Sequence, residues 1–216
     1  MVRLACMAIG YLFGLFQTSY IYGRMHGIDI RDYGSGNAGT TNMFRTLGKG
    51  AGVITFLGDG LKPVFAAILT YVLFGKAYAD IWPLLCLYTG AGAILGHNFP
   101  FYLGFRGGKG IATTGGTILA LNRPMCGLAI LTFALGFFLS QYVSVGSLLV
   151  CTGFLIETVI FGQMGIFGMT QRYLNEMYVL SAAITILAFY KHRGNIDRLR
   201  KGEERRAGIF KKSEKK

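Results

Sequence analysis

The longest stretch of the chain without a charged residue runs from Pro124 to Ile156 and reads PMCGLAILTFALGFFLSQYVSVGSLLVCTGFLI. A helix needs about 20 apolar residues to cross the hydrocarbon core of a bilayer, so this stretch is too long for one crossing. It continues past Glu157 to Gln171, and it divides best at the polar pair Ser140–Gln141. The stretch therefore predicts two membrane-spanning helices.

Further apolar segments extend this pattern over most of the chain. They are Leu4–Tyr22, Ala51–Phe74, Ile81–Phe99, Gly110–Asn122 and Tyr173–Tyr190, of which Gly110–Asn122 is short and rich in glycine and threonine. Hydrophobic residues make up 52% of the 216 residues and charged residues only 15%, whereas a soluble domain has about 25% charged residues. We expect an all-α integral membrane protein with seven transmembrane helices, one of them short.

The basic residues are distributed unevenly over the predicted connections. Seventeen Lys and Arg lie in the connections 24–50 and 98–110 and in the tail 191–216, whereas the alternate connections hold only Lys76, Arg123 and Arg172. Connections rich in Lys and Arg face the cytoplasm. We therefore expect residues 1–190 to form one seven-helix membrane domain with its N-terminus outside, cytoplasmic motif loops at 24–50 and 98–110, and a basic cytoplasmic tail at 191–216.

The first cytoplasmic motif, Gly34–Arg45, reads GSGNAGTTNMFR. Its glycines match G-x-G-x-x-G, and Asp59 follows at the distance typical of a dinucleotide site, but no strand is predicted before the motif and Asp59 lies in a predicted span, which excludes that fold. Glycines still allow backbone N–H groups to surround an anion, and a helix beginning near Thr40 would add its positive end. Ser35, Thr40, Thr41 and Asn42 supply further donors, and Arg45 shares a helix face with Thr41 and Asn42. The alternative is a flexible loop with a membrane-flanking basic residue.

The second motif, residues 96–116, reads GHNFPFYLGFRGGKGIATTGG. It lacks the Walker pattern, because a glycine follows Lys109 where Ser or Thr is required, so nucleoside triphosphate binding is not expected. A lysine between glycines, before a predicted helix start, is still suited to a phosphate or oxyanion. His97 is either part of this site or a hydrogen-bonded histidine at the end of a helix.

The third motif, residues 192–206, reads HRGNIDRLRKGEERR. A basic segment beside a membrane commonly binds anionic lipids, but His192 and Asn195 are polar side chains three residues apart at the predicted membrane surface. His192 and Asp197 also fit H-x-x-x-x-D, an acid–base pair of another acyltransferase superfamily. A match at two positions is weak support for that pair.

In this order along the chain, the three motifs resemble those of the bacterial acyl-phosphate:glycerol-3-phosphate acyltransferases, small integral membrane enzymes that start phospholipid synthesis. The first family motif is similar to Gly34-Ser35-Gly36-Asn37-x-Gly39-x-Thr41-Asn42-x-x-Arg45. The second is similar to Gly96-His97-x-x-Pro100 together with Gly107-Gly108-Lys109-Gly110. The third is similar to His192-Arg193-x-Asn195-Ile196-x-Arg198-Leu199, followed by Gly202 and Glu204. The family has seven helices, and Asp59 and Lys62 resemble an acid–lysine pair in its second span. Asp197 departs from the family, which often has a basic residue there.

The resemblance implies that the protein transfers a fatty acyl group from acyl phosphate to the 1-hydroxyl of sn-glycerol 3-phosphate, giving 1-acyl-sn-glycerol 3-phosphate (lysophosphatidic acid) and phosphate. It implies catalytic roles for Ser35, Arg45, Lys109, His192 and Asn195. It implies substrate or phosphate binding by Gly34, Gly36, Asn37, Gly39, Thr41, Asn42, Gly107, Gly108, Gly110, His97 and Glu204. Either His192 or the phosphate of the donor accepts the hydroxyl proton.

The expected partners are the two substrates and membrane lipids, with no nucleic acid and no cofactor. No metal is expected either, because Cys6, Cys86, Cys126 and Cys151 lie singly in apolar stretches without metal-ligand spacing. We expect a monomer that passes several times through the bacterial cell membrane, with its active site facing the cytoplasm. The alternatives are a transporter of an organic phosphate, which predicts a site near the middle of the membrane, and a lipid-binding assembly factor.

Overall fold

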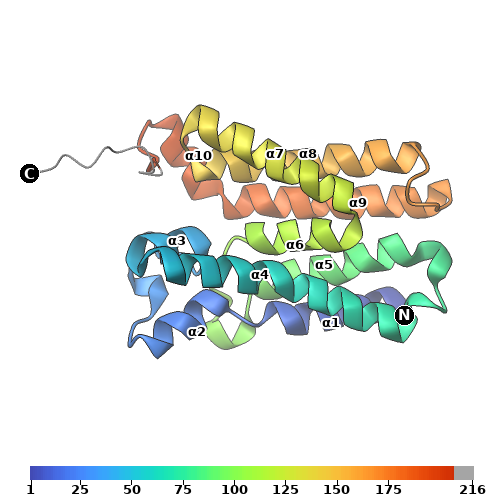
Figure 1. The fold of residues 1–216 in the computed structure, drawn as a ribbon, viewed down its shortest axis with the longest axis horizontal. Coiled ribbons are helices and arrows are strands. Elements are labelled where there is room, and N and C mark those ends of the chain that lie inside the picture. Colours follow the sequence, from blue (N-terminus) through green and yellow to red (C-terminus); the bar gives the residue numbers. More distant parts are fainter. Residues whose placement is uncertain (207–216) are drawn as a thin grey trace, which may run out of the picture.

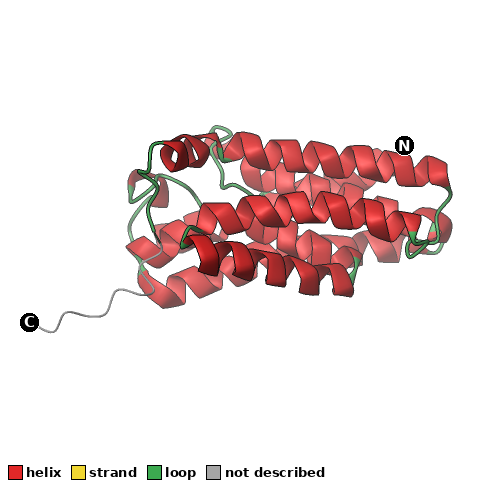
Figure 2. Cartoon of the chain, turned by 90° about the horizontal axis from the view of Figure 1, so that it is seen from above, coloured by secondary structure: helices red, strands yellow, loops and turns green. Residues whose placement is uncertain are grey.

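The computed structural model describes residues 1–206, and its helices run nearly parallel in one elongated bundle (Figure 1). A second view shows the same bundle with loops gathered at its two ends (Figure 2). Within the described residues no β-strand occurs, as predicted. Residues 207–216, which belong to the predicted basic tail, lie outside the described part of the chain.

The α-helices of residues 1–206 follow the predicted apolar segments closely. They are α1 (Val2–Gly14), α2 (Thr18–Met25), α3 (Thr40–Thr46), α4 (Gly48–Thr70), α5 (Trp82–Asn98), α6 (Ile111–Leu121), α7 (Arg123–Ser140), α8 (Val143–Gln163), α9 (Gln171–Lys191) and α10 (Arg193–Arg200). A π-helical turn, η2 (Tyr71–Gly75), extends α4, and short 3-10 turns occur at η1 (Ile30–Asp32), η3 (Ala79–Ile81) and η4 (Phe101–Leu103).

Six helical segments of the described chain are long and apolar enough to cross a membrane: Val2–Met25, Gly48–Gly75, Ala79–Leu103, Arg123–Ser140, Val143–Gln163 and Gln171–Lys191. The predicted division of the long uncharged stretch is confirmed, because α7 ends at Ser140, Gln141 has a left-handed φ of 66°, and α8 begins at Val143. The short predicted span is α6, with only 11 residues. A seventh crossing by α6 therefore stays a prediction.

The helix α6 reverses the direction of the chain between α5 and α7, so the N-terminus and α10 lie at opposite ends of the bundle (Figure 1). It packs closely against α4 and α5. A methyl group on Gly116 would lie 1.8 Å from the Gly60 carbonyl oxygen, and one on Gly90 would lie 2.0 Å from the Thr117 side chain. Small residues allow membrane helices to approach this closely.

The first predicted span is not one continuous helix, because the chain breaks between Gly14 and Thr18. The break leaves main-chain carbonyl groups without helical partners. The Gln17 side chain donates to Gly14 O (3.2 Å) and to His97 O (3.0 Å), and Lys62 Nζ donates to Phe16 O (2.9 Å). Partners from α4 and α5 therefore stabilise the break.

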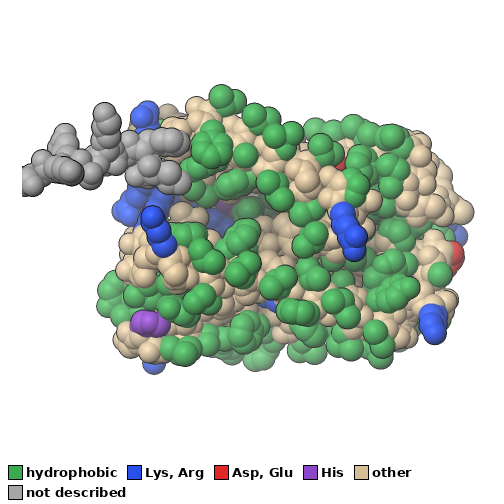
Figure 3. Space-filling view, viewed as in Figure 1, with side chains coloured by type: hydrophobic (Ala, Val, Ile, Leu, Met, Phe, Trp, Pro, Cys, Tyr) green, Lys and Arg blue, Asp and Glu red, His purple; other side chains and the backbone are tan. Residues whose placement is uncertain are grey.

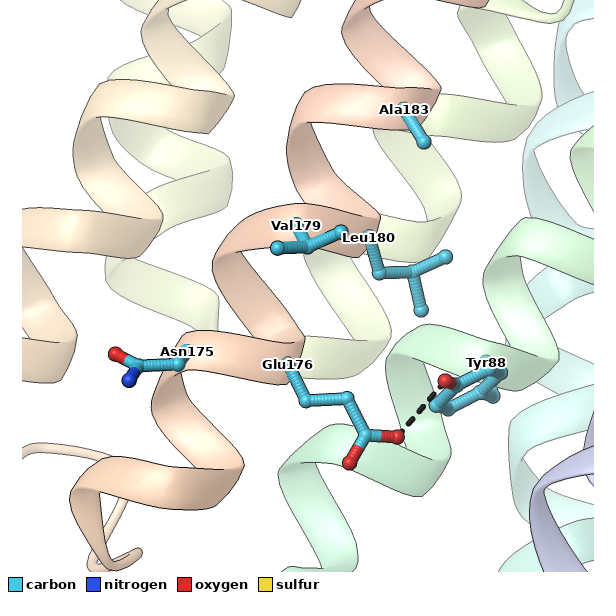
Figure 4. A pocket seen from close by; sticks show the side chains of 6 residues that line it. All are labelled: Tyr88, Asn175, Glu176, Val179, Leu180 and Ala183. Atoms are coloured by element: carbon cyan, nitrogen blue, oxygen red, sulfur yellow. Dashed lines mark hydrogen bonds between the residues drawn. The ribbon is translucent and has the colours of Figure 1, made fainter.

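At the end of the bundle near the N-terminus, an ion pair connects the first and last long helices. The Arg3 guanidinium donates to both carboxylate oxygens of Glu176, at 2.5 and 2.8 Å. The Tyr88 hydroxyl donates to the same carboxylate at 2.8 Å (Figure 4). Tyr88 and Glu176 border a mainly apolar groove of about 430 Å³ between α5 and α9.

The surface of the bundle agrees with the predicted pattern of charge. Hydrophobic side chains cover most of the face seen in Figure 3, and several Lys and Arg side chains gather at its left end, where α10 lies in Figure 1. The loops that carry the three motifs lie at this same end (Figure 1).

Candidate active site

The three predicted motifs meet at one end of the bundle. The first motif contains α3, the second leads into α6, and the third begins where α9 ends and contains α10. These elements lie together in Figure 1, although their residues are far apart in the sequence.

The loop of the first motif is organised by Asn42, which is 1% exposed. Its Oδ1 accepts a hydrogen bond from Ser35 N (2.9 Å), and its Nδ2 donates to Ile30 O (3.1 Å) and Tyr33 O (2.9 Å). Gly34 has a left-handed φ of 61°, and a methyl group there would lie 2.3 Å from Asn42 Oδ1. The amide of Asn42 is therefore committed to the loop backbone.

The other residues of the first motif present a mixed surface. Ser35, Gly36 and Arg45 are exposed, whereas Asn37 and Thr41 are partly buried. The predicted helix start is confirmed, because α3 begins at Thr40 with Gly39 as its N-cap.

The loop of the second motif folds back onto the end of α5. Gly107 N donates to Asn98 O (3.3 Å), and Gly108 N donates to His97 O (3.1 Å). A methyl group on Gly108 would lie 2.2 Å from His97 Nε2 and 2.5 Å from Ala38 O of the first motif. Gly108 is therefore the point at which the first and second motifs are in contact, and Gly110 then caps α6 with a left-handed φ of 80°.

Lys109 joins the second motif to the third. Its Nζ donates to Asn195 Oδ1, and Asn195 Nδ2 donates to Glu204 Oε1 at 2.6 Å. Glu204 also accepts from Ser144 Oγ (3.0 Å) and from Arg198 Nε (2.8 Å). The result is a continuous network of hydrogen bonds from the loop before α6 to the start of α8.

Burial and neighbouring groups shift the pKa values of Lys109 and Glu204 in this network. Burial lowers the pKa of the Lys109 ammonium to about 8, although the Glu204 carboxylate opposes this change. Burial alone would raise the pKa of the Glu204 carboxyl, but hydrogen bonds from Asn195, Arg198 and Ser144 outweigh it and hold the pKa below its usual value. Both groups are therefore charged at neutral pH.

His192 is neutral at this pH. Burial, followed by the nearby charge of Lys109, lowers the pKa of its imidazole to about 4. Its Nδ1 lies 2.8 Å from Ala188 O. A carbonyl oxygen can only accept, so Nδ1 carries the proton and Nε2 keeps a free lone pair.

Arg45 belongs to the same group of charges. Desolvation lowers the pKa of its guanidinium, and the nearby charge of Arg205 adds to this effect, whereas Glu204 opposes it. The site therefore contains three cations whose charges affect one another, Arg45, Lys109 and Arg198, and the Glu204 carboxylate lies among them.

The structure bears on two alternatives that the sequence left open, at His97 and at Asp197. His97 is only 3% exposed, and its Nδ1 lies 2.7 Å from Lys62 Nζ, so its ring lies behind the second loop. Asp197 forms an exposed ion pair with Lys201 at 3.0 Å, whereas His192 Nδ1 bonds to a backbone carbonyl. This arrangement does not support a His192–Asp197 pair.

Other residues reach the site without having been predicted. Ser144 lies in the first turn of α8, in a mainly apolar stretch where a serine gives no signal in the sequence. Lys191 donates to Asn98 O at 3.2 Å and lies 4.8 Å from the centre of the Phe99 ring. Within residues 1–206, the His, Cys, Asp and Glu side chains form no group of three that could hold a metal ion.

The chain is similar to known proteins along nearly its whole length. The model of the family described as glycerol-3-phosphate acyltransferase matches residues 4–202. A glycerol-3-phosphate acyltransferase of Clostridioides difficile is 41% identical over 202 residues, which are 93% of this chain and 93% of the relative. One of Alkaliphilus metalliredigens is 37% identical over 210 residues, which are 96% of this chain and 97% of the relative.

Solved structures show the same similarity. The crystal structure of PlsY (YgiH), an integral membrane glycerol 3-phosphate acyltransferase in its glycerol 3-phosphate form, has a TM-score of 0.80 at 30% identity and covers 95% of this chain and 96% of that chain. The lysophosphatidic acid form has a TM-score of 0.77 at 30% identity and covers 95% of both chains.

Proposed function

The chain belongs to the glycerol-3-phosphate acyltransferase family, and we propose that its acyl donor is acyl phosphate. In this reaction the 1-hydroxyl oxygen of sn-glycerol 3-phosphate forms a bond to the acyl carbonyl carbon, and the bond from that carbon to the phosphate oxygen breaks. The products are 1-acyl-sn-glycerol 3-phosphate and inorganic phosphate. The observation that carries the proposal is the group of cations, Arg45, Lys109 and Arg198, at one end of an apolar bundle.

Both substrates carry a phosphate, so the site must hold two anions side by side against their repulsion. Arg45 offers a planar fork that can bind a phosphate through two hydrogen bonds, whereas Lys109 offers a point charge. Asn195 and Glu204 orient Lys109 through the network described above. The side chains of Ser35, Asn37 and Thr41 complete the two phosphate sites, because Gly107 N and Gly108 N already donate to main-chain carbonyl groups.

The proton of the attacking hydroxyl passes to the departing phosphate. With a pKa of about 4, His192 is a weak base, and the departing phosphate is a stronger one, since even a phosphate monoester has a second pKa near 6. The free lone pair of His192 Nε2 instead accepts a hydrogen bond from the hydroxyl and orients it. Acyl phosphate is already activated, so orientation and stabilisation of negative charge by Lys109 supply the catalysis.

The donor is tested by measuring the release of phosphate from palmitoyl phosphate by purified protein in detergent, with and without sn-glycerol 3-phosphate. We expect release that depends on glycerol 3-phosphate and matches the formation of lysophosphatidic acid. Palmitoyl-coenzyme A serves as the matched donor. Transfer from the thioester but not from palmitoyl phosphate would contradict the proposal.

The protein is further proposed to cross the bacterial cell membrane seven times as a monomer, with its N-terminus outside and its active site facing the cytoplasm. Support comes from the excess of basic residues in the motif connections and from the position of the N-terminus and α10 at opposite ends of the bundle (Figure 1). In a chain whose four native cysteines are replaced, Ser213→Cys should react with an impermeant thiol reagent only from the cytoplasmic side. Lys76→Cys should react only from outside, and the reverse pattern would contradict this topology.

A further inference from the structure

A cluster of buried polar side chains lies next to the glycine loops, where α1, α4 and α5 meet. Asp59 and Lys62 of α4 and His97 of α5 are at most 4% exposed, and Gln17 at the break after α1 is fully buried. Charged groups inside a membrane domain are rare because removing an ion from water is costly. The reaction scheme above makes no use of Asp59 or Lys62.

The ammonium group of Lys62 is surrounded by acceptors. Its Nζ lies 2.7 Å from His97 Nδ1, 2.9 Å from Phe16 O, 3.1 Å from Asp59 Oδ1 and 3.3 Å from Gly14 O. An ammonium group can only donate hydrogen bonds. His97 Nδ1 therefore accepts from Lys62, and the proton of the neutral imidazole ring lies on Nε2.

His97 connects this cluster to both glycine loops. Its carbonyl accepts hydrogen bonds from Gly108 N (3.1 Å) and Gln17 Nε2 (3.0 Å). Its Nε2 faces the point where Gly108 packs against Ala38, within 2.2 Å of the place that a methyl group on Gly108 would occupy. Because Lys109 follows Gly108 directly, a displacement of His97 would displace Lys109 as well.

We propose that Asp59 and Lys62 are positioning residues for acyl transfer. They hold His97 in one tautomer and one place, and through His97 they align the first glycine loop with the second. Stability alone does not account for the pair, because replacing a buried ion pair by uncharged residues of similar volume is often neutral or stabilising. The inference uses the transferase reaction proposed above as its readout.

The double variant Asp59→Asn/Lys62→Met separates positioning from stability. It removes both charges together, so no unpaired ion is left in the interior, and it keeps the side-chain lengths similar. We expect a folded protein whose kcat/KM for both substrates is lower by about tenfold or more, because a misplaced loop weakens the alignment of the reactants. A purely structural pair would instead change the melting temperature and leave kcat/KM of the folded fraction unaltered.

The matched control is Arg3→Met/Glu176→Gln, which removes the ion pair at the opposite end of the bundle. This control should retain kcat/KM within about twofold of the wild type, since distant sites act independently. A folded Asp59→Asn/Lys62→Met variant with kcat/KM within about threefold of the wild type would overturn the proposal, because positioning effects are expected to be larger.

His97→Asn provides a second test if the double variant does not fold. The Asn carbonyl can accept from Lys62 in place of Nδ1, but the side chain has no donor at the position of Nε2. We again expect a loss of about tenfold or more in kcat/KM, and wild-type kinetics in this variant would refute the role of His97 as the connection.

A binding measurement keeps this inference separate from the identity of the acyl donor. Glycerol 3-phosphate should raise the melting temperature of the wild type by binding to the folded state. Glycerol 3-phosphate should raise the melting temperature of the double variant, or of His97→Asn, by less than it raises that of the wild type. An equal increase in melting temperature would count against the positioning role. Failure of the wild type to use palmitoyl phosphate would refute the proposed donor, whatever these melting experiments show.

Discussion

The variant Gly108→Ala adds one methyl group at the contact between the two glycine loops, and we expect it to lower acyl transfer by about a hundredfold. The new carbon would lie 2.2 Å from His97 Nε2 and 2.5 Å from Ala38 O, whereas ordinary contacts begin at 3.4 Å. Ala38 O belongs to the main chain, and His97 is held by Lys62. The second loop must therefore move by about 1 Å to make room.

The expected magnitude follows from this displacement. Lys109 is the next residue, so its contact with Asn195 moves with the loop. A displacement of about 1 Å in a group that positions a substrate can reduce the rate by about 10², which corresponds to about 2.7 kcal/mol of transition-state stabilisation.

The assay is the initial rate of phosphate release, with folding checked by thermal melting in detergent. Gly115→Ala in α6 is the control, because its methyl group would meet nothing within 4 Å. Alanine inside a helix is more stable than glycine by about 0.5–1 kcal/mol, so this control should remain folded and active. A folded Gly108→Ala protein with activity within about threefold of the wild type would refute the reasoning, because a loop displaced by about 1 Å cannot keep that rate.

Three further predictions concern the charged network. Arg45→Lys keeps the charge but loses the planar fork, so kcat/KM for glycerol 3-phosphate should fall by about tenfold or more; steady-state kinetics showing no change would contradict a phosphate contact. The kcat/KM profile should fall as pH rises through about 8, because Lys109 is cationic only below its pKa, and a profile that stays flat to about pH 9.5 would exclude a role for this charge. Glu204→Gln removes the carboxylate that raises the pKa of Lys109, so the alkaline fall should move to lower pH and the rate at neutral pH should decrease, and an unshifted profile would show that Glu204 does not control Lys109.

Much of the fold follows from local properties of the sequence. The length of each apolar segment predicted the long helices, and the polar pair Ser140–Gln141 correctly marked the turn between α7 and α8. The break after Gly14 was not predicted, because its partners are distant in the sequence. Lys62 satisfies the Phe16 carbonyl, and Gln17 reaches the His97 carbonyl, only when α4 and α5 are packed beside α1.

The candidate site shows the same division between local and distant information. Glycines and basic residues with characteristic spacing marked the three motifs, and the charge pattern predicted that they share one end of the bundle. The role of Ser144 was not visible, because α8 also contains Ser147 and nothing local distinguishes the two serines. The burial of His97 against Lys62 was equally hidden, since it depends on the packing of α4 against α5.

The ion pair between Arg3 and Glu176 connects residues that are 173 positions apart in the chain. Synthesis on the ribosome proceeds from the N-terminus, so Arg3 is made long before its carboxylate partner. In the folded structure α1 also packs against α4 and α5, which are made before α9. The ion pair can therefore form only after α9 has been made, and a chain that stops before α9 lacks the carboxylate that pairs with Arg3.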